Sequence, residues 1–149
     1  MNRDLKLLCI GTLPFWVGIV LNSVLNLFPI PVFFFSVVYL LLWTYLCCRC
    51  CDPRQSLLRQ GLLLCLFGFV MLVLVAYQEC IRGGYWMNYF GIATQLYFLP
   101  ALSFSAFLLR PFTDTIAAFP AYVAEMALMA LCCFGGCLLK ARKKNHRKK

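Results

Sequence analysis

The sequence predicts an all-α integral membrane protein: a four-transmembrane-helix bundle with both termini cytoplasmic and a re-entrant or interfacial segment between spans three and four. Three observations predict this class. The 149 residues are 63% hydrophobic and only 13% charged, which is more apolar surface than a soluble domain of this size can bury. The apolar stretches are continuous, and each approaches the about 20 residues that a helix needs to cross a bilayer. They do not alternate with period two, as the strands of a membrane barrel would.

The first two spans are predicted at about residues 7–28 and 32–48. The first stretch is too long for a signal peptide, contains two asparagines and lacks a small-residue cleavage site, so we expect it to remain in the mature chain. Pro29 and Pro31 then require a tight turn, because proline cannot continue the hydrogen-bond ladder of a helix.

The third and fourth spans are predicted at about residues 57–77 and 120–139. Asp52 followed by Pro53 is typical of a helix N-cap and first turn, so a new helix should start there and lead into the third span. A basic tail, residues 140–149, follows the fourth span. Neither a repeat nor a separate soluble region interrupts the chain, which we interpret as a single membrane domain.

The outer segment, residues 78–119, contains a further apolar stretch at 91–109 whose placement decides the topology. If this stretch does not cross, twelve of the 14 lysine and arginine residues share the side of the termini, and only Arg82 and Arg110 lie opposite. If it crosses, the split becomes six and eight, so the positive-inside rule favours four spans. Pro100 and its polar neighbours predict an interfacial or re-entrant segment, with a fifth span as the remaining alternative.

One carboxylate, Glu125, falls inside a predicted span, and ionisable residues at that depth are functional candidates. Ala117 and Ala121 precede it on the same helical stripe, so we expect Glu125 to face protein or a cavity rather than lipid. Other polar residues should converge with Glu125 on the outer half of the bundle. They complete a candidate binding site: Asn22, Asn26, Gln78, Glu79, Arg82, Gln95 and Arg110. The alternative is that these residues only hold helices together by hydrogen bonds.

The ten cysteines do not predict a disulfide-bonded outer domain, since only Cys80 is expected on the outer face. Four others form the sequence CCRCC at 47–51, at the cytoplasmic end of the second span. We interpret the cysteines as small apolar residues, with palmitoylation, metal binding and thiol redox chemistry as alternatives. The single histidine, His146, lies in the basic tail, so we predict no metal site and no cofactor.

The sequence contains no Ser–His, Cys–His or metal-ligand set, so we expect no enzymatic activity. The leading hypothesis is a small transport- or channel-related protein of the plasma membrane with an outward-facing polar site around Glu125. Four helices barely enclose a pathway, so we expect a homo-oligomer or a larger membrane-protein partner. The alternative is a non-catalytic accessory, immunity or assembly subunit that binds such a partner. The basic tail is expected to contact anionic lipids and not nucleic acid.

Overall fold

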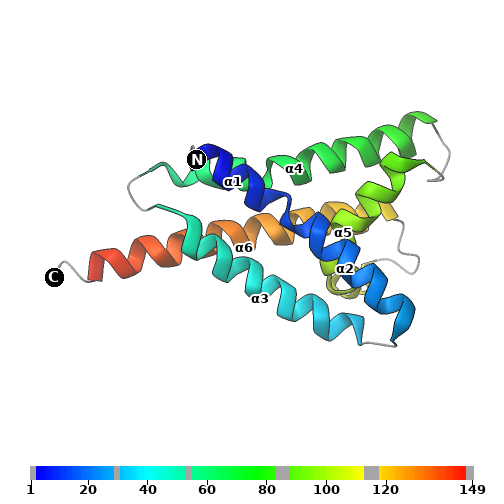
Figure 1. Ribbon diagram of the computed structural model, residues 1–149, viewed down its shortest axis with the longest axis horizontal. Helices are drawn as coiled ribbons and strands as arrows, with labels where there is room; N and C mark the ends of the chain where they lie inside the picture. Colours follow the sequence, from blue (N-terminus) through cyan, green and yellow to red (C-terminus); the bar gives the residue numbers. More distant parts are fainter. Residues whose placement is uncertain (1–2, 29–30, 53–54, 83–87, 113–117, 147–149) are drawn as a thin grey trace.

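The computed structural model describes residues 3–28, 31–52, 55–82, 88–112 and 118–146, and these ranges are helical nearly throughout (Figure 1). No strand occurs among them, so the predicted all-α class is confirmed. The elements in chain order are α1 (Arg3–Gly11), α2 (Leu13–Leu27), α3 (Val32–Cys50), α4 (Leu57–Tyr77), the π-helical turn η1 (Gln78–Arg82), α5 (Tyr89–Leu109) and α6 (Ala118–His146).

Within the described ranges, five helical units are long and apolar enough to cross a membrane. They are α1 together with α2, then α3, α4 with its extension, α5, and α6. The helix α4 has the bounds predicted for the third span. The outer stretch at 91–109 is one uninterrupted helix and not a broken hairpin, although Pro100 lies inside it. A proline is tolerated within a membrane helix because neighbouring groups satisfy the backbone that it leaves unpaired.

The first predicted span is divided near residue 12, where α1 ends and α2 begins. Pro14 lies in the first turn of α2 and has no N–H to continue the ladder from α1. The Thr12 hydroxyl donates to the Cys9 carbonyl oxygen over 2.8 Å, which satisfies one of the carbonyl groups at the end of α1. The sequence pattern of apolar residues continues through this joint, so hydropathy alone predicted one helix.

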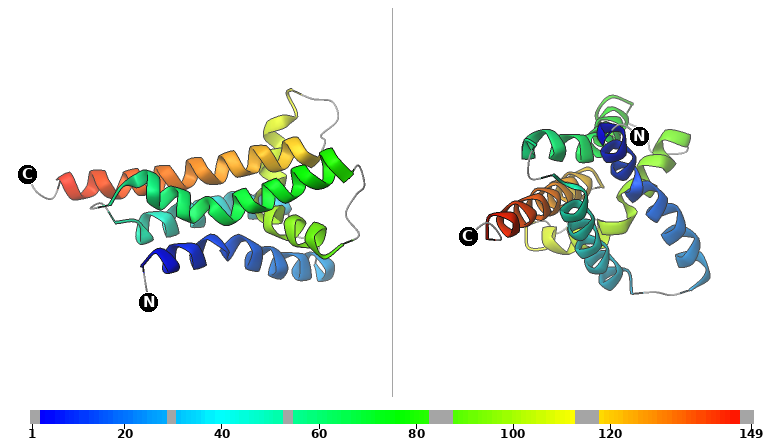
Figure 2. Two further views of the ribbon diagram at one scale, coloured as in Figure 1. Left: turned by 90° about the horizontal axis from the view of Figure 1, so that it is seen from above. Right: turned by 60° about the vertical axis from the view of Figure 1, so that its left-hand side comes forward.

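Helix α1 packs mainly against α4, α2 packs mainly against α5, and α3 packs mainly against α6. The helix α5 contacts α2, α3, α4 and α6. It runs across the direction of α4 and α6 rather than alongside them, and it lies between α2 and α3 (Figure 2). Consecutive helices α2 and α3 are therefore held apart by α5 instead of forming a packed hairpin.

The start of α1, the end of α3, the start of α4 and the end of α6 lie at one end of the molecule, here called the basic end (Figure 1). A disulfide bond joins Cys51 at the end of α3 to Cys137 on α6 at this end. The helix α4 starts at Leu57 with Ser56 as its N-cap residue, so the prediction that Asp52 caps a new helix is wrong. Asp52 instead forms an ion pair with Arg3 on α1.

Candidate functional site

The carboxyl group of Glu125 lies in the interior of the bundle, on α6. Its side chain is 0% exposed, and Ala121 one turn earlier is 2% exposed. The small side chain at 121 lets neighbouring helices approach α6 closely, as predicted for this residue, whereas Ala117 lies outside the described residues. Glu125 Oε1 accepts a hydrogen bond from the backbone N–H of Ala101 on α5, with an N–O distance of 3.2 Å. The carboxyl group thus joins α6 to the middle of α5.

Pro100 makes the middle of α5 unusual. It lacks an N–H, so the Leu96 carbonyl, four residues earlier, has no intrahelical donor from that position. This carbonyl faces Gly18 on α2. A Cβ atom at residue 18 would overlap the Leu96 oxygen and lie 2.7 Å from the Leu96 carbonyl carbon. On either side of Pro100, the backbone of α5 is therefore contacted by another helix, at Gly18 of α2 and at Glu125 of α6.

Three buried oxygen atoms around this point have no hydrogen-bond partner among the described residues: Glu125 Oε2, Tyr39 Oη and Tyr97 Oη. They come from α6, α3 and α5, respectively. Gly68 on α4 provides room for the Tyr97 hydroxyl, because a Cβ at residue 68 would lie 2.7 Å from Tyr97 Oη. Unpaired buried oxygens in a native core require an explanation, such as a bound ion, a water molecule or a proton-transfer role.

The other residues predicted for the site are not gathered around Glu125. Asn22 and Asn26 are exposed on α2, Arg110 is exposed after α5, and Gln95 is half-buried. No hydrogen bond within the described ranges joins any of these side chains to Glu125. Glu125 lies in the core of the bundle, whereas the side chains of Asn22 and Asn26 are exposed on the surface of α2 and point away from this core.

The remaining predicted residues lie around the turn η1 that follows α4. Gln78 is buried, and its Nε2 donates to Asn88 Oδ1 over 3.2 Å; the same oxygen accepts from the backbone N–H of Gly91 and caps α5. Glu79 Oε2 is buried with no partner among the described residues. The backbone of Arg82 belongs to η1, while its side chain lies outside the described part of the chain. These contacts attach the start of α5 to the end of α4.

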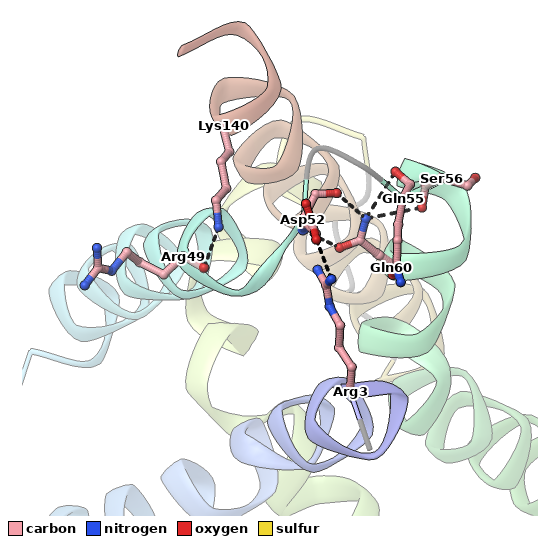
Figure 3. Close-up of polar contacts among 7 residues, drawn as sticks. All are labelled: Arg3, Arg49, Asp52, Gln55, Ser56, Gln60 and Lys140. Atoms are coloured by element: carbon pink, nitrogen blue, oxygen red, sulfur yellow. Dashed lines mark hydrogen bonds and ion pairs between the residues drawn. The ribbon is translucent and has the colours of Figure 1, made fainter. Parts of the chain in front are cut away.

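Sequence reasoning missed a second polar centre at the basic end, built around Gln60 (Figure 3). Gln60 is fully buried, and its Oε1 accepts from the backbone N–H of Asp52 over 2.6 Å. Its Nε2 donates to the Asp52 carbonyl oxygen at 2.9 Å, with longer contacts to the carbonyls of Gln55 and Ser56. One side chain therefore holds the connection between α3 and α4. The available signal was a glutamine directly after Arg59 in the first turn of a helix that is otherwise mostly apolar.

Within the described ranges, no group of three or more histidine, cysteine, aspartate or glutamate side chains could hold a metal ion. The free cysteines among these residues are distributed over several helices, from exposed Cys9 and Cys80 to buried Cys47 and Cys133. The arrangement around Glu125 offers oxygen atoms, which suit a proton or a small hard cation better than a soft metal.

No known family model matches the chain, and no curated protein or solved structure matches it either. The functional proposal therefore rests on the geometry of the chain itself.

Proposed function

We propose that the protein is a small transport- or channel-related membrane protein whose functional group is the Glu125 carboxyl. One observation carries this proposal: a fully buried carboxyl group has one oxygen bound to α5 and the other unpartnered among the described residues, in a core where two tyrosine hydroxyls also lack a partner among these residues. Such a group can take up a proton or a small cation. An ionisable residue at membrane depth is energetically costly, so its presence there favours a functional role. The Pro100 region of α5 supplies the element that could move when the carboxyl changes its charge.

The topology that we propose has four crossing units, both termini in the cytoplasm of a plasma-membrane protein, and α5 lying across the outer half of the bundle. Two observations support it. Both ends of the described chain lie at the basic end (Figure 1). Most of the lysine and arginine residues belong to the helix ends that meet there, according to the sequence and the bounds of the helices. The helix α5 runs across its neighbours, whereas membrane-spanning helices are tilted by only about 20° on average from the bilayer normal.

This topology predicts the chemical state of the cysteines in cells. A membrane-impermeant maleimide should label Cys80 on intact cells, since this residue is exposed in η1 at the opposite end from the basic end. The structure joins Cys51 to Cys137 by a disulfide bond, but if the basic end faces the cytosol we expect these two thiols to be reduced in cells, because the cytosolic thiol pool opposes stable disulfides. Mass spectrometry after rapid alkylation and denaturation measures the labelling of Cys80 and the redox state of the Cys51–Cys137 pair. Cys80→Ser is the control for the labelling. An oxidised pair in freshly trapped cells would place the basic end in an oxidising compartment and reverse the topology.

The Glu125 proposal is tested by replacing the carboxyl with its neutral isostere. Glu125→Gln keeps an oxygen that can accept from Ala101 N–H but cannot take up a proton or hold a cation by charge. We expect proton or cation flux into reconstituted vesicles to fall to the level of empty vesicles, while the protein still folds and assembles. Asp4→Asn is the matched control, since this carboxylate lies on α1 and forms an ion pair with Arg59.

Unchanged flux in Glu125→Gln, with normal assembly of both variants, would rule out the transport role of this carboxyl. It would leave the second candidate, a non-catalytic accessory, immunity or assembly subunit. An apolar groove of about 300 Å³ between α2 and α3 favours that alternative; its walls include Trp16, Val20 and Phe35, and Trp16 is 62% exposed. A homo-oligomer or a larger membrane protein could cover this surface, and either would also complete a pathway that one chain does not enclose.

A further inference from the structure

A cavity of about 380 Å³ opens at the basic end, far along α6 from Glu125. Three separate parts of the chain line it: α1, the end of α3 with the two residues that follow it, and the late part of α6. The cationic side chains at its wall are Arg3, Lys6 and Lys140; Asp52 is the carboxylate, and Leu7 and Cys51 supply apolar surface. The lining therefore carries more positive than negative charge and comes from segments that only the folded chain brings together.

The hydrogen bonds at the cavity leave most of its cationic donors available. Arg3 Nη1 contacts Asp52 Oδ2 at 2.5 Å, and a guanidinium has five N–H donors (Figure 3). Lys140 Nζ donates to the Arg49 carbonyl oxygen over 2.7 Å, which uses one of its three donors. Lys6 is exposed and has no hydrogen bond or ion pair with another described residue. Asp4, the other carboxylate of α1, is paired with Arg59 and does not line the cavity.

We propose that this cavity binds a phosphate-bearing anion. A guanidinium and two ammonium groups around one space are the side chains that proteins use for phosphate, with arginine giving planar recognition and lysine a point charge. The ion pair with Arg3 compensates the one carboxylate in the lining. The volume exceeds that of a bare phosphate group, and the apolar wall of Leu7 and Cys51 suits the organic part of a phosphate ester.

The source of the phosphate is either a lipid headgroup or a soluble phosphate compound. The cavity lies where the candidate membrane spans that contain α1, α3 and α6 begin or end, which in the proposed topology is the level of the lipid headgroups. This site differs from the diffuse attraction between a basic tail and an anionic bilayer. Arg142, two residues beyond Lys140, lines a different pocket with Thr44 and Leu138, so it provides a charge of the same sign outside the cavity.

The test measures binding to the purified full-length chain in detergent, with phosphatidylglycerol, phosphatidylcholine, glycerol 3-phosphate and inorganic phosphate as separate probes. Native mass spectrometry or a fluorescent competitor gives the dissociation constants. We expect Lys6→Gln and Lys140→Gln each to weaken binding roughly tenfold, as loss of a charge-assisted hydrogen bond does. Arg142→Gln, which removes the same charge from the same helix as Lys140→Gln, should change binding less than about twofold. None of these measurements depends on Glu125 or on the direction of the topology.

Asp52→Asn should change the binding affinity in the opposite direction, towards tighter binding. It removes the carboxylate and releases Arg3 from its ion pair, while the backbone of residue 52 can still bond to Gln60. We expect binding to become several-fold tighter. Binding of phosphatidylglycerol but not of the soluble probes would identify a lipid headgroup, and the reverse would identify a soluble ester or phosphate.

Three results would overturn the proposal. The first is binding of no phosphate-bearing probe, and the second is equal binding of phosphatidylcholine and phosphatidylglycerol with no competition by soluble phosphates. The third is an equal loss in Lys140→Gln and Arg142→Gln, which would mean that only net charge matters.

Discussion

Among Gly→Ala substitutions at the described glycines, Gly18→Ala is expected to destabilise the protein most. The added Cβ would overlap the Leu96 carbonyl oxygen and approach the Leu96 carbonyl carbon to 2.7 Å and its Cα to 3.3 Å. All three are backbone atoms, so no side-chain rotation relieves the overlap, and α2 must move away from α5. We expect a loss of about 3 kcal/mol or more in the free energy of unfolding, at the upper end for overpacked cores. Chemical denaturation in detergent micelles measures it.

Gly135→Ala is the matched control for this substitution. Gly135 also lies within a long helix, but a Cβ there would meet no atom within 4 Å. Alanine has the higher helix propensity, so Gly135→Ala should leave stability unchanged or raise it by up to about 1 kcal/mol. Equal stability of the two variants would show that α2 and α5 are not in contact at Leu96.

Gln60→Leu is expected to cause the second large loss, by removing the hydrogen bonds that hold the connection between α3 and α4. Leucine has a similar size but leaves the Asp52 N–H and carbonyl groups without the partners that Gln60 provides. A buried backbone N–H left unpaired costs about 1–3 kcal/mol, whereas the Asp52 carbonyl keeps its hydrogen bond from the Gln55 N–H, so we expect a loss of about 1–3 kcal/mol in the free energy of unfolding. The protein should also become sensitive to proteases between α3 and α4 before it unfolds globally.

Two further variants make this prediction specific. Gln60→Glu keeps an oxygen that can accept from the Asp52 N–H but loses the amide donor, so its stability should lie between those of the wild-type and leucine variants. Gln55→Leu changes an exposed glutamine whose backbone carbonyl, and not its side chain, takes part in the network. A loss in Gln55→Leu as large as that in Gln60→Leu would contradict the central role of the buried side chain.

Several features of the fold followed from the sequence because they depend on local composition. Long apolar stretches predicted helices, and α4 occupies the range expected for the third span because residues before and after it are polar or helix-terminating. The burial of Glu125 followed from a carboxylate within an apolar helix and from the alanine one turn earlier. These inferences needed no knowledge of which helices meet.

What the sequence could not provide was the pairing of helices. Asn22 and Asn26 were expected near Glu125 because all three should lie at similar depth, but depth does not specify the direction in which a side chain points. The contact between Gly18 and Leu96 joins residues 78 positions apart, and neither residue is unusual by itself. The role of Asp52 was mistaken for a similar reason: its partner Arg3 lies at the start of the chain, beyond any local pattern.

The pairing of α1 with α4, α2 with α5 and α3 with α6 has a consequence for biosynthesis. When the ribosome has completed α3, none of the helices made so far has its main partner, so the early chain must remain in the membrane as loosely associated segments. The interior closes only after α5 has entered between α2 and α3 and α6 has followed. Chaperone-like protection or rapid translation of the second half would therefore matter more for this chain than for a bundle of sequential hairpins.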